Sequence, residues 1–141
     1  MDVSDLLRLI STNNMIQIFA YLLMERRIVL CSSKLSVLSQ CTQGLVALLF
    51  PFSWQYIFIP VLPNNLIMFC CAPMPFVIGM MTEHIDELAT LKDAMNEVFI
   101  FNIDSNRWLD KPEGIDDSKN LPEGPLNSLN YWIPKLKSLY C

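Results

Sequence analysis

Few side chains in this sequence could carry out bond chemistry. Histidine is the side chain that most often acts as a base at neutral pH, and the chain has only one, His84. A serine or cysteine nucleophile needs such a base beside it, and the GxSxG motif of a nucleophile elbow does not occur. We expect His84 to be a surface residue at the start of a helix, with a catalytic role as the alternative, and we predict no enzyme of bond chemistry.

The five cysteines could bind zinc, form disulfides or remain free. They are Cys31, Cys41, Cys70, Cys71 and Cys141. Their number is odd, no CxxC pair occurs, and two adjacent cysteines suit neither an ordinary disulfide nor a pair of zinc ligands. Free buried cysteines in a reducing compartment are therefore expected, which favours a cytoplasmic location.

Cofactor and metal motifs are equally sparse. The four glycines form neither the GxxxxGK nor the GxGxxG pattern that cradles phosphates. An acidic segment near the C-terminus could bind a cation, but its spacing does not fit an EF-hand and predicts a solvated loop instead; its residues are Asp110, Glu113, Asp116, Asp117 and Glu123. No cofactor or metal is expected, and a net charge of −4 argues against a nucleic-acid partner.

A long uncharged block dominates the middle of the chain. Residues 35–82 contain no Asp, Glu, Lys or Arg, and apolar residues make up 52% of the whole chain. A membrane-spanning helix needs about 20 uninterrupted apolar residues, whereas several prolines and polar side chains interrupt this block. The block therefore predicts a buried core, and at most a peripheral membrane association. Its methionines, Met68, Met74, Met80 and Met81, are expected to fill that core instead of forming an adaptable binding surface.

The elements that must position these residues alternate between helix and strand. Helices are expected at residues 11–25 with Ser11 or Thr12 as the cap, at 35–50, and after a capping Thr82. Short apolar runs predict buried strands at 26–31, 56–61, 76–80 and 97–104. Such alternation predicts an α/β fold in which βαβ units build a mainly parallel sheet, flanked by helices in three layers.

The connecting segments are also predicted from turn residues. We expect a turn or short helix at residues 64–71, a turn at 104–106, a polar loop from Arg107, and a last helix at 126–139 that Pro134 interrupts.

Three stretches carry a resemblance to a known family. "LLMERRIVLCSSKLSVLSQC", "ALLFPFSWQYIFIPVLP" and "CCAPMPFVIGM" resemble the central section of a DENN domain, where "LLERR", "SxKLS", "IPVLP" and "PxPFxxG" follow one another. The matching residues are Leu22, Leu23, Glu25, Arg26, Arg27, Lys34, Leu35, Ser36, Pro51, Trp54, Gln55, Pro60, Leu62, Pro63, Pro73, Pro75, Phe76 and Gly79. We accordingly expect residues 1–129 to form a central DENN section, part of the family's C-terminal lobe, and residues 130–141 to form a separate C-terminal segment.

The resemblance implies a guanine nucleotide exchange factor for a Rab-type small GTPase. Such a protein promotes GDP release by binding the switch regions, and it needs no bond chemistry. Its partners would be the GTPase and the remaining DENN lobes, and it would be cytoplasmic or peripheral on vesicle membranes. The alternative is a DENN-like scaffold that binds a protein without opening a nucleotide site; a small hydrolase and a membrane-embedded fragment are less favoured.

Seven residues are the candidates for the GTPase interface: Trp54, Gln55, Pro60, Leu62, Pro63, Arg26 and Arg27. The first five are expected around a strand and its carboxyl end, where ligands gather in open α/β sheets. Trp54 and the prolines could alternatively pack two lobes together or cap the core. The two arginines could interact with a helix dipole, or with a carboxylate or phosphate of a partner.

Overall fold

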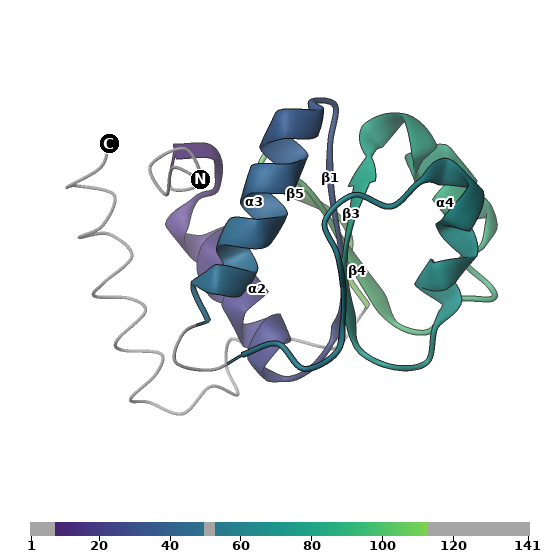
Figure 1. Cartoon of the computed structure of the whole chain (residues 1–141), viewed down its shortest axis with the longest axis horizontal. Coiled ribbons are helices and arrows are strands. Elements are labelled where there is room, and N and C mark those ends of the chain that lie inside the picture. Colours follow the sequence, from purple (N-terminus) through teal and green to yellow (C-terminus); the bar gives the residue numbers. More distant parts are fainter. Residues whose placement is uncertain (1–7, 50–52, 113–141) are drawn as a thin grey trace.

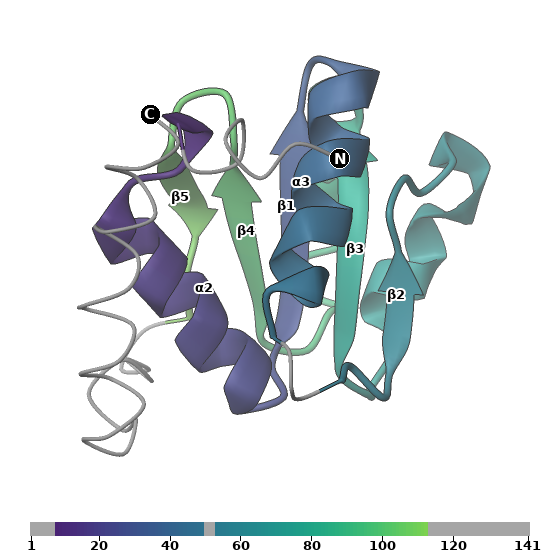
Figure 2. The same ribbon diagram turned by 60° about the vertical axis from the view of Figure 1, so that its left-hand side comes forward.

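A five-stranded sheet runs through the centre of the chain (Figure 2). This computed structural model describes residues 8–49 and 53–112. The strands follow the order β2-β3-β1-β4-β5, with the first four parallel and β5 antiparallel to β4. Their bounds are Arg27–Ser32 for β1, Ile57–Ile59 for β2, Phe76–Met81 for β3, Val98–Asn102 for β4 and Arg107–Asp110 for β5. The predicted α/β fold with a mainly parallel sheet is confirmed.

Helices cover both faces of this sheet (Figure 1). On one face lie α2 (Thr12–Leu23) and α3 (Leu35–Ala47). On the other lie α4 (Ile85–Thr90) and the 3₁₀ helix η1 (Asn64–Cys71), whereas a short 3₁₀ turn, η2 (Thr82–His84), leads from β3 into α4. The result is the expected sandwich of three layers, helix, sheet and helix.

Because β1 is covered on both faces, five of its six residues are buried. Ile28 and Leu30 pack with α2 and α3 in a first core, and Val29 packs in a second core with Leu88 of α4. Cys31, Cys41 and Cys70 are buried and form no disulfide, as predicted, whereas Cys71 forms no disulfide but is only half-buried. Of the four methionines expected in the core, Met80 is fully buried, but Met68 and Met74 are exposed, so that prediction is wrong for these two.

The start of α2 is fixed by a cap and by the turn after β4. The hydroxyl of Ser11 accepts a hydrogen bond from the Asn14 backbone N–H at 3.4 Å, which confirms Ser11 as a cap. Asn106 closes the predicted turn at residues 104–106 with a φ of 54°. Its side-chain oxygen accepts from the Ser11 N–H at 3.0 Å, and its carbonyl accepts from the Asn14 amide at 2.9 Å.

A second polar cluster joins the carboxyl ends of β1 and β4. The Asp104 carboxylate accepts hydrogen bonds from the Ser32 hydroxyl (2.7 Å), the Ser33 N–H (2.7 Å) and the Ser33 hydroxyl (2.8 Å). Burial raises the pKa of this carboxyl group, but the three hydrogen bonds and the charge of Lys34 outweigh it, and the net pKa is lowered. Asp104 therefore holds the turn that leads into α3.

Three expectations need correction. The polar loop expected from Arg107 begins as strand β5, because the ring of Trp108 packs on Tyr21 and Phe101 at 5.3 and 5.0 Å between centroids. Thr82 does not cap α4, since the turn η2 intervenes and α4 begins at Ile85 without a side-chain cap. The strand expected at 56–61 is shorter, Ile57–Ile59, and it closes before Pro60, as expected of a residue that has no N–H for the ladder. The helix expected at 126–139 and the boundary after residue 129 lie outside the described residues.

Candidate functional site

The predicted contact residues divide between the two ends of β2. Trp54 and Gln55 precede this strand, whereas Pro60, Leu62 and Pro63 follow it. The five residues therefore surround a strand, as expected, but only the second group lies beyond its carboxyl end.

The first group lies at the amino edge, the edge of the sheet at which the parallel strands begin (Figure 2). Glu25 and Arg26 lead into β1, and Gln55 and Tyr56 lead into β2. These two leading segments are in contact, since the Tyr56 hydroxyl donates to the Glu25 carboxylate at 2.9 Å. The structure thus brings together two of the sequence motifs that the family resemblance depended on.

Exposed apolar side chains surround this contact. Leu23, Met24 and Tyr56 are 36%, 37% and 40% exposed. We call the surface that they form with their polar neighbours the amino-edge surface; its residues are Leu23, Met24, Glu25, Trp54, Gln55 and Tyr56. Exposed apolar side chains become informative about a protein contact when they lie together and not singly.

Trp54 is held firmly within this surface. Its indole N–H donates to the Ile57 carbonyl at 2.9 Å. Its ring meets the ring of Tyr56 edge to face, with 5.6 Å between centroids, and also packs against the first core. Trp54 therefore covers the core with one side and remains half-buried. Its position fits a core-capping role, and it also fits a role in contacting a partner.

A small hollow lies between Trp54 and the end of α2. Its volume is about 170 Å³. The lining residues come from the end of α2, from the segment after α3 and from the segment before β2; they are Leu22, Leu23, Glu25, Leu49, Ser53, Trp54, Gln55 and Tyr56. Its walls are mainly apolar, and Glu25 is the one ionised side chain among these residues.

Glu25 has an unusual backbone conformation. Its φ is 58°, in the left-handed region. Its N–H donates to the Leu22 carbonyl at 3.1 Å, and the Arg26 N–H donates to the Tyr21 carbonyl at 2.9 Å. These two hydrogen bonds form a Schellman motif at the end of α2, in which the left-handed position is usually glycine. A glutamate there costs about 1 kcal/mol of conformational strain.

Arg27 is engaged within the chain. Its guanidinium donates to the Pro73 carbonyl at 2.7 Å and to the Glu97 carbonyl at 3.3 Å. These carbonyls belong to the segments that lead into β3 and β4, so Arg27 ties the beginnings of three strands together at the amino edge. The sequence led us to expect Arg27 to interact with a helix dipole or with an acidic group of a partner, and neither expectation describes these hydrogen bonds to backbone carbonyls. Arg26 is half-buried beside Glu25.

The second group, after β2, is built around a close backbone approach. A Cβ placed on Gly79 would lie 1.8 Å from the Pro60 carbonyl oxygen, so only glycine fits there. The Leu62 N–H donates to the Gly79 carbonyl at 2.7 Å. The Leu62 side chain is only 2% exposed and belongs to the second core, whereas Pro63 is exposed at the start of η1.

Beyond Pro63, the helix η1 exposes a second apolar area. Leu66, Met68 and Phe69 are 40%, 61% and 47% exposed and, with Asn65, line a hollow of about 270 Å³. We call these three residues the η1 patch. The sequence did not indicate it, because a charge-free segment predicts burial and gives no sign of which side chains stay outside.

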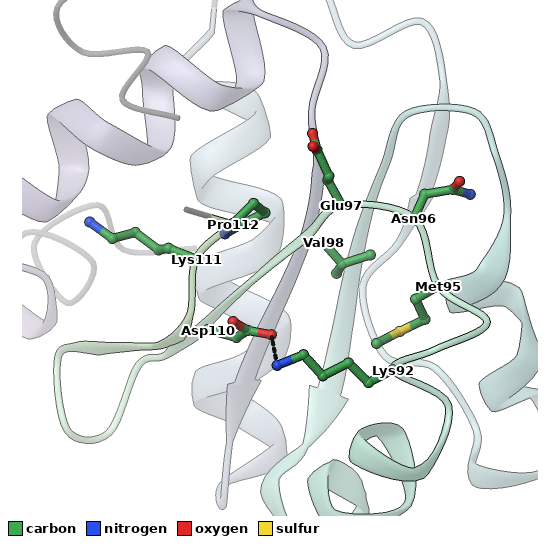
Figure 3. Close-up of a pocket in the computed structure, with 8 residues that line it drawn as sticks. All are labelled: Lys92, Met95, Asn96, Glu97, Val98, Asp110, Lys111 and Pro112. Atoms are coloured by element: carbon green, nitrogen blue, oxygen red, sulfur yellow. Dashed lines mark ion pairs between the residues drawn. The ribbon is translucent and has the colours of Figure 1, made fainter. Parts of the chain in front are cut away.

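A third hollow, of about 420 Å³, lies between the loop after α4 and the end of β5 (Figure 3). Lys92 points across it to Asp110, with 3.8 Å between the charged atoms, and Lys111 lies at its rim. Both members of this ion pair are solvent-exposed, and such a pair contributes little to binding or stability. The sequence missed this site, because nothing predicted the strand that carries Asp110 alongside Lys92.

The described residues offer little for bond chemistry. His84 is half-buried at the end of η2, with its Nε2 atom 3.5 Å from the Glu83 carboxylate, so it is less exposed than the surface position expected from the sequence. Burial raises the pKa of Cys31 to about 11 and that of Cys70 to about 12, so neither is a thiolate at neutral pH. In the part of the chain that is described, no three His, Cys, Asp or Glu side chains are grouped as metal ligands. The amino edge instead presents exposed apolar side chains next to an aromatic pair that two hydrogen bonds hold in place.

Comparison with known proteins identifies the family. The model of the DENN (AEX-3) domain matches residues 1–106. The chain belongs to the DENN domain family. It is 40% identical over 129 residues to DENN domain-containing protein 1A of Xenopus laevis, 42% over 126 residues to 1B of Homo sapiens, and 35% over 140 residues to 2A of Mus musculus.

These alignments cover 92%, 89% and 99% of this DENN-family chain, but only 12%, 16% and 14% of the three relatives. The region matched to the DENN domain includes the amino-edge surface and the η1 patch. It ends before Asp110 and Lys111, which line the hollow of Figure 3. Among the described helices of this DENN-family chain, none has the length and apolar character to cross a membrane.

Proposed function

We propose that this chain is the central section of a guanine nucleotide exchange factor for a Rab-type GTPase, and that its amino-edge surface contacts the GTPase. The observation that carries the proposal is the set of exposed apolar side chains around a fixed aromatic pair, Trp54 and Tyr56. Membership of the DENN family supports the proposal, since the family resemblance implies exchange activity on Rab proteins.

Exchange of this kind is a matter of differential binding. A GTPase holds its nucleotide with ordered switch loops. A partner that binds more tightly to the form with displaced switches must weaken nucleotide binding by the same factor. The exchange factor needs no nucleophile or base for this step, only a surface complementary to the displaced state.

Rigidity makes the amino-edge surface suitable for that task. The Trp54 indole is fixed by the Ile57 carbonyl, and Tyr56 is fixed by Glu25. Side chains that are ordered before binding lose less conformational entropy when the partner arrives. Aromatic anchors of this sort contribute a large share of binding energy at protein interfaces.

The seven candidate residues then take different roles. Trp54 and Gln55 are contact residues, with Arg26 beside them at the same edge. Arg27 acts indirectly, through its hydrogen bonds to the segments before β3 and β4, and Leu62 is a core residue. For the two prolines after β2, Pro60 and Pro63, the alternative of packing against the remaining DENN lobes is the better fit, since they lie at the opposite end of the strand.

The location follows from the same proposal. An exchange factor for Rab proteins would act in the cytoplasm, including the surface of vesicles. Attachment there would come from the GTPase or from other parts of the full protein.

Release of a fluorescent GDP analogue tests the proposal. The full chain, alone and joined to the remaining DENN sections, is mixed with a panel of Rab proteins and release is followed over time. We expect faster release from at least one Rab with the joined protein. We also expect that Trp54→Ala reduces the acceleration about tenfold or more, and that Gln55→Ala, which removes an exposed side chain without disturbing the core, reduces it less.

Two results would decide against this function. Binding of a Rab protein without faster release would favour the DENN-like scaffold. Absence of any Rab binding by the joined protein would contradict the proposal as a whole. Circular dichroism of Trp54→Ala shows whether a loss of activity reflects lost contact or lost folding.

A further inference from the structure

The hollow between Trp54 and the end of α2 has the size of a side-chain pocket. We call this hollow, with its eight lining residues, the Glu25 pocket. Its volume of about 170 Å³ is below the range of about 300–1,000 Å³ that is usual for small-molecule sites. It has room for one long side chain of a partner protein.

The chemistry of the pocket is apolar with one negative charge. Leu22, Leu49 and Trp54 supply apolar walls, and Glu25 lies at the rim with its carboxylate hydrogen-bonded to the Tyr56 hydroxyl. That hydroxyl is a neutral donor and occupies one carboxylate oxygen, Oε2. A carboxylate can accept several hydrogen bonds, so acceptor capacity remains for a ligand.

The left-handed backbone of Glu25 is the second observation that points to function. Glycine would be more stable at this end of α2, and it would lack the carboxylate. Backbone strain of this type is concentrated at sites where a side chain is needed for binding or catalysis. The strain here places a carboxylate beside two aromatic rings.

From these observations we propose that the Glu25 pocket binds one basic side chain, lysine or arginine, of the GTPase partner. The aliphatic stem would lie against Leu22, Leu49 and Trp54, and the cation would meet the Glu25 carboxylate. The nearby rings of Trp54 and Tyr56 add a cation–π attraction. This inference rests on the proposed function, since the partner that supplies the side chain is the GTPase.

Three variants of the joined protein test the inference through association with nucleotide-free Rab. Glu25→Gln keeps a hydrogen-bond acceptor for Tyr56 but removes the charge, and we expect about tenfold weaker association. Glu25→Gly also removes the carboxylate, and we expect a similar loss of association with unchanged or increased resistance to urea. A residue needed only for folding would not give that pair of results. Glu87→Gln, an equal charge change at an exposed carboxylate of α4, away from the amino edge, is the control and should bind as the unaltered protein does.

Titration of the full chain with a small guanidinium compound tests binding to the Glu25 pocket in the absence of a GTPase. Butylguanidinium imitates an arginine side chain, and butylurea is its uncharged equivalent. We expect butylguanidinium to shift the indole ¹⁵N–H resonance of Trp54, butylurea to shift it much less, and Glu25→Gln to abolish the difference.

The two experiments separate the inference from the proposed function. Normal Rab association of Glu25→Gln, or a Trp54 resonance that does not respond to butylguanidinium, would overturn the inference and leave the exchange function standing. A protein that binds no Rab would overturn both the exchange function and the identity of the partner. In that case, a Trp54 shift with butylguanidinium alone would still support a pocket for a basic side chain.

Discussion

Replacing Gly79 by alanine tests whether the close approach of two backbones holds β2 and η1 in place. The new methyl group would lie 1.8 Å from the Pro60 carbonyl oxygen and 2.8 Å from its carbonyl carbon. Real Cβ contacts essentially never fall below 3.0 Å, so the two segments must separate by at least about 1.2 Å, which is 3.0 minus 1.8. A backbone atom cannot move aside as a flexible side chain would.

The expected cost follows from three contributions. Overpacking of a buried site costs about 1–3 kcal/mol. Separation of the segments also stretches the 2.7 Å hydrogen bond from the Leu62 N–H to the Gly79 carbonyl, which is worth about 1 kcal/mol. The lower entropy of the unfolded alanine variant returns about 0.4–1 kcal/mol. We expect a net loss of about 1–3.5 kcal/mol of unfolding free energy, with about 2 kcal/mol from the middle values.

Urea unfolding followed by tryptophan fluorescence measures this loss. With an m value of about 2 kcal/mol/M, the midpoint of Gly79→Ala should fall by about 1 M. Ser36→Ala, at an exposed position in α3, is the control and should stay within about 0.5 kcal/mol of the unaltered chain. If Gly79→Ala does not purify, pulse proteolysis in lysate gives the same midpoint. A midpoint equal to that of the control would refute the reasoning.

Three further predictions concern other parts of the fold. Because its pKa is lowered, the Asp104 carboxylate stabilises the fold above its ordinary pKa of about 4, and this contribution is lost as the pH falls through the folded-state pKa. Asp104→Asn should therefore lower the urea midpoint at pH 7, and it should lower it much less at pH 3. The control Asp93→Asn, at an exposed position, should leave the midpoint unchanged at both pH values. Equal effects of the two variants would contradict the stabilising role of the Asp104 carboxylate. Arg27→Lys loses one of two hydrogen bonds to backbone carbonyls, about 1 kcal/mol, so calorimetry should show a melting temperature lower by about 3–5 °C, and an unchanged value would count against the tie between the strand beginnings. The double variant Met68→Ser with Phe69→Ser should reduce binding of an apolar dye without lowering the unfolding free energy; undiminished dye binding would show that the η1 patch is not the exposed surface.

The sequence predicted the central strands well because a strand buried on both faces is a continuous apolar run in the sequence. A run such as residues 28–31, apolar throughout, indicates that helices cover both sides of the sheet. The antiparallel edge strand β5 has only a weak apolar pattern, since Arg107 and Leu109 are exposed and only Trp108 packs against the core. Its four residues therefore read as a loop.

The seven residues named for the GTPase interface remain a prediction, and the sequence did not show how they are arranged in space. The strand predicted at 56–61 contains β2, but the sequence did not show that Trp54 and Gln55 lie beside Glu25 while Pro60 lies at the other end of that strand. Glu25 was recognised as part of a motif, but its left-handed conformation was not, because glycine is the residue that normally signals this position.

The pairing of β1 has a consequence for how the protein is made. Arg27 in this central strand pairs with Phe76 on one side and with Val98 on the other. Of the five described strands, β1 is therefore synthesised first but completes its pairing only when β4 has been made. Until β4 has been synthesised, one long apolar edge has no partner, and nascent chains in that state tend to aggregate unless chaperones bind them. Slow translation between β3 and β4 would therefore lower the yield of folded protein without any change in its sequence.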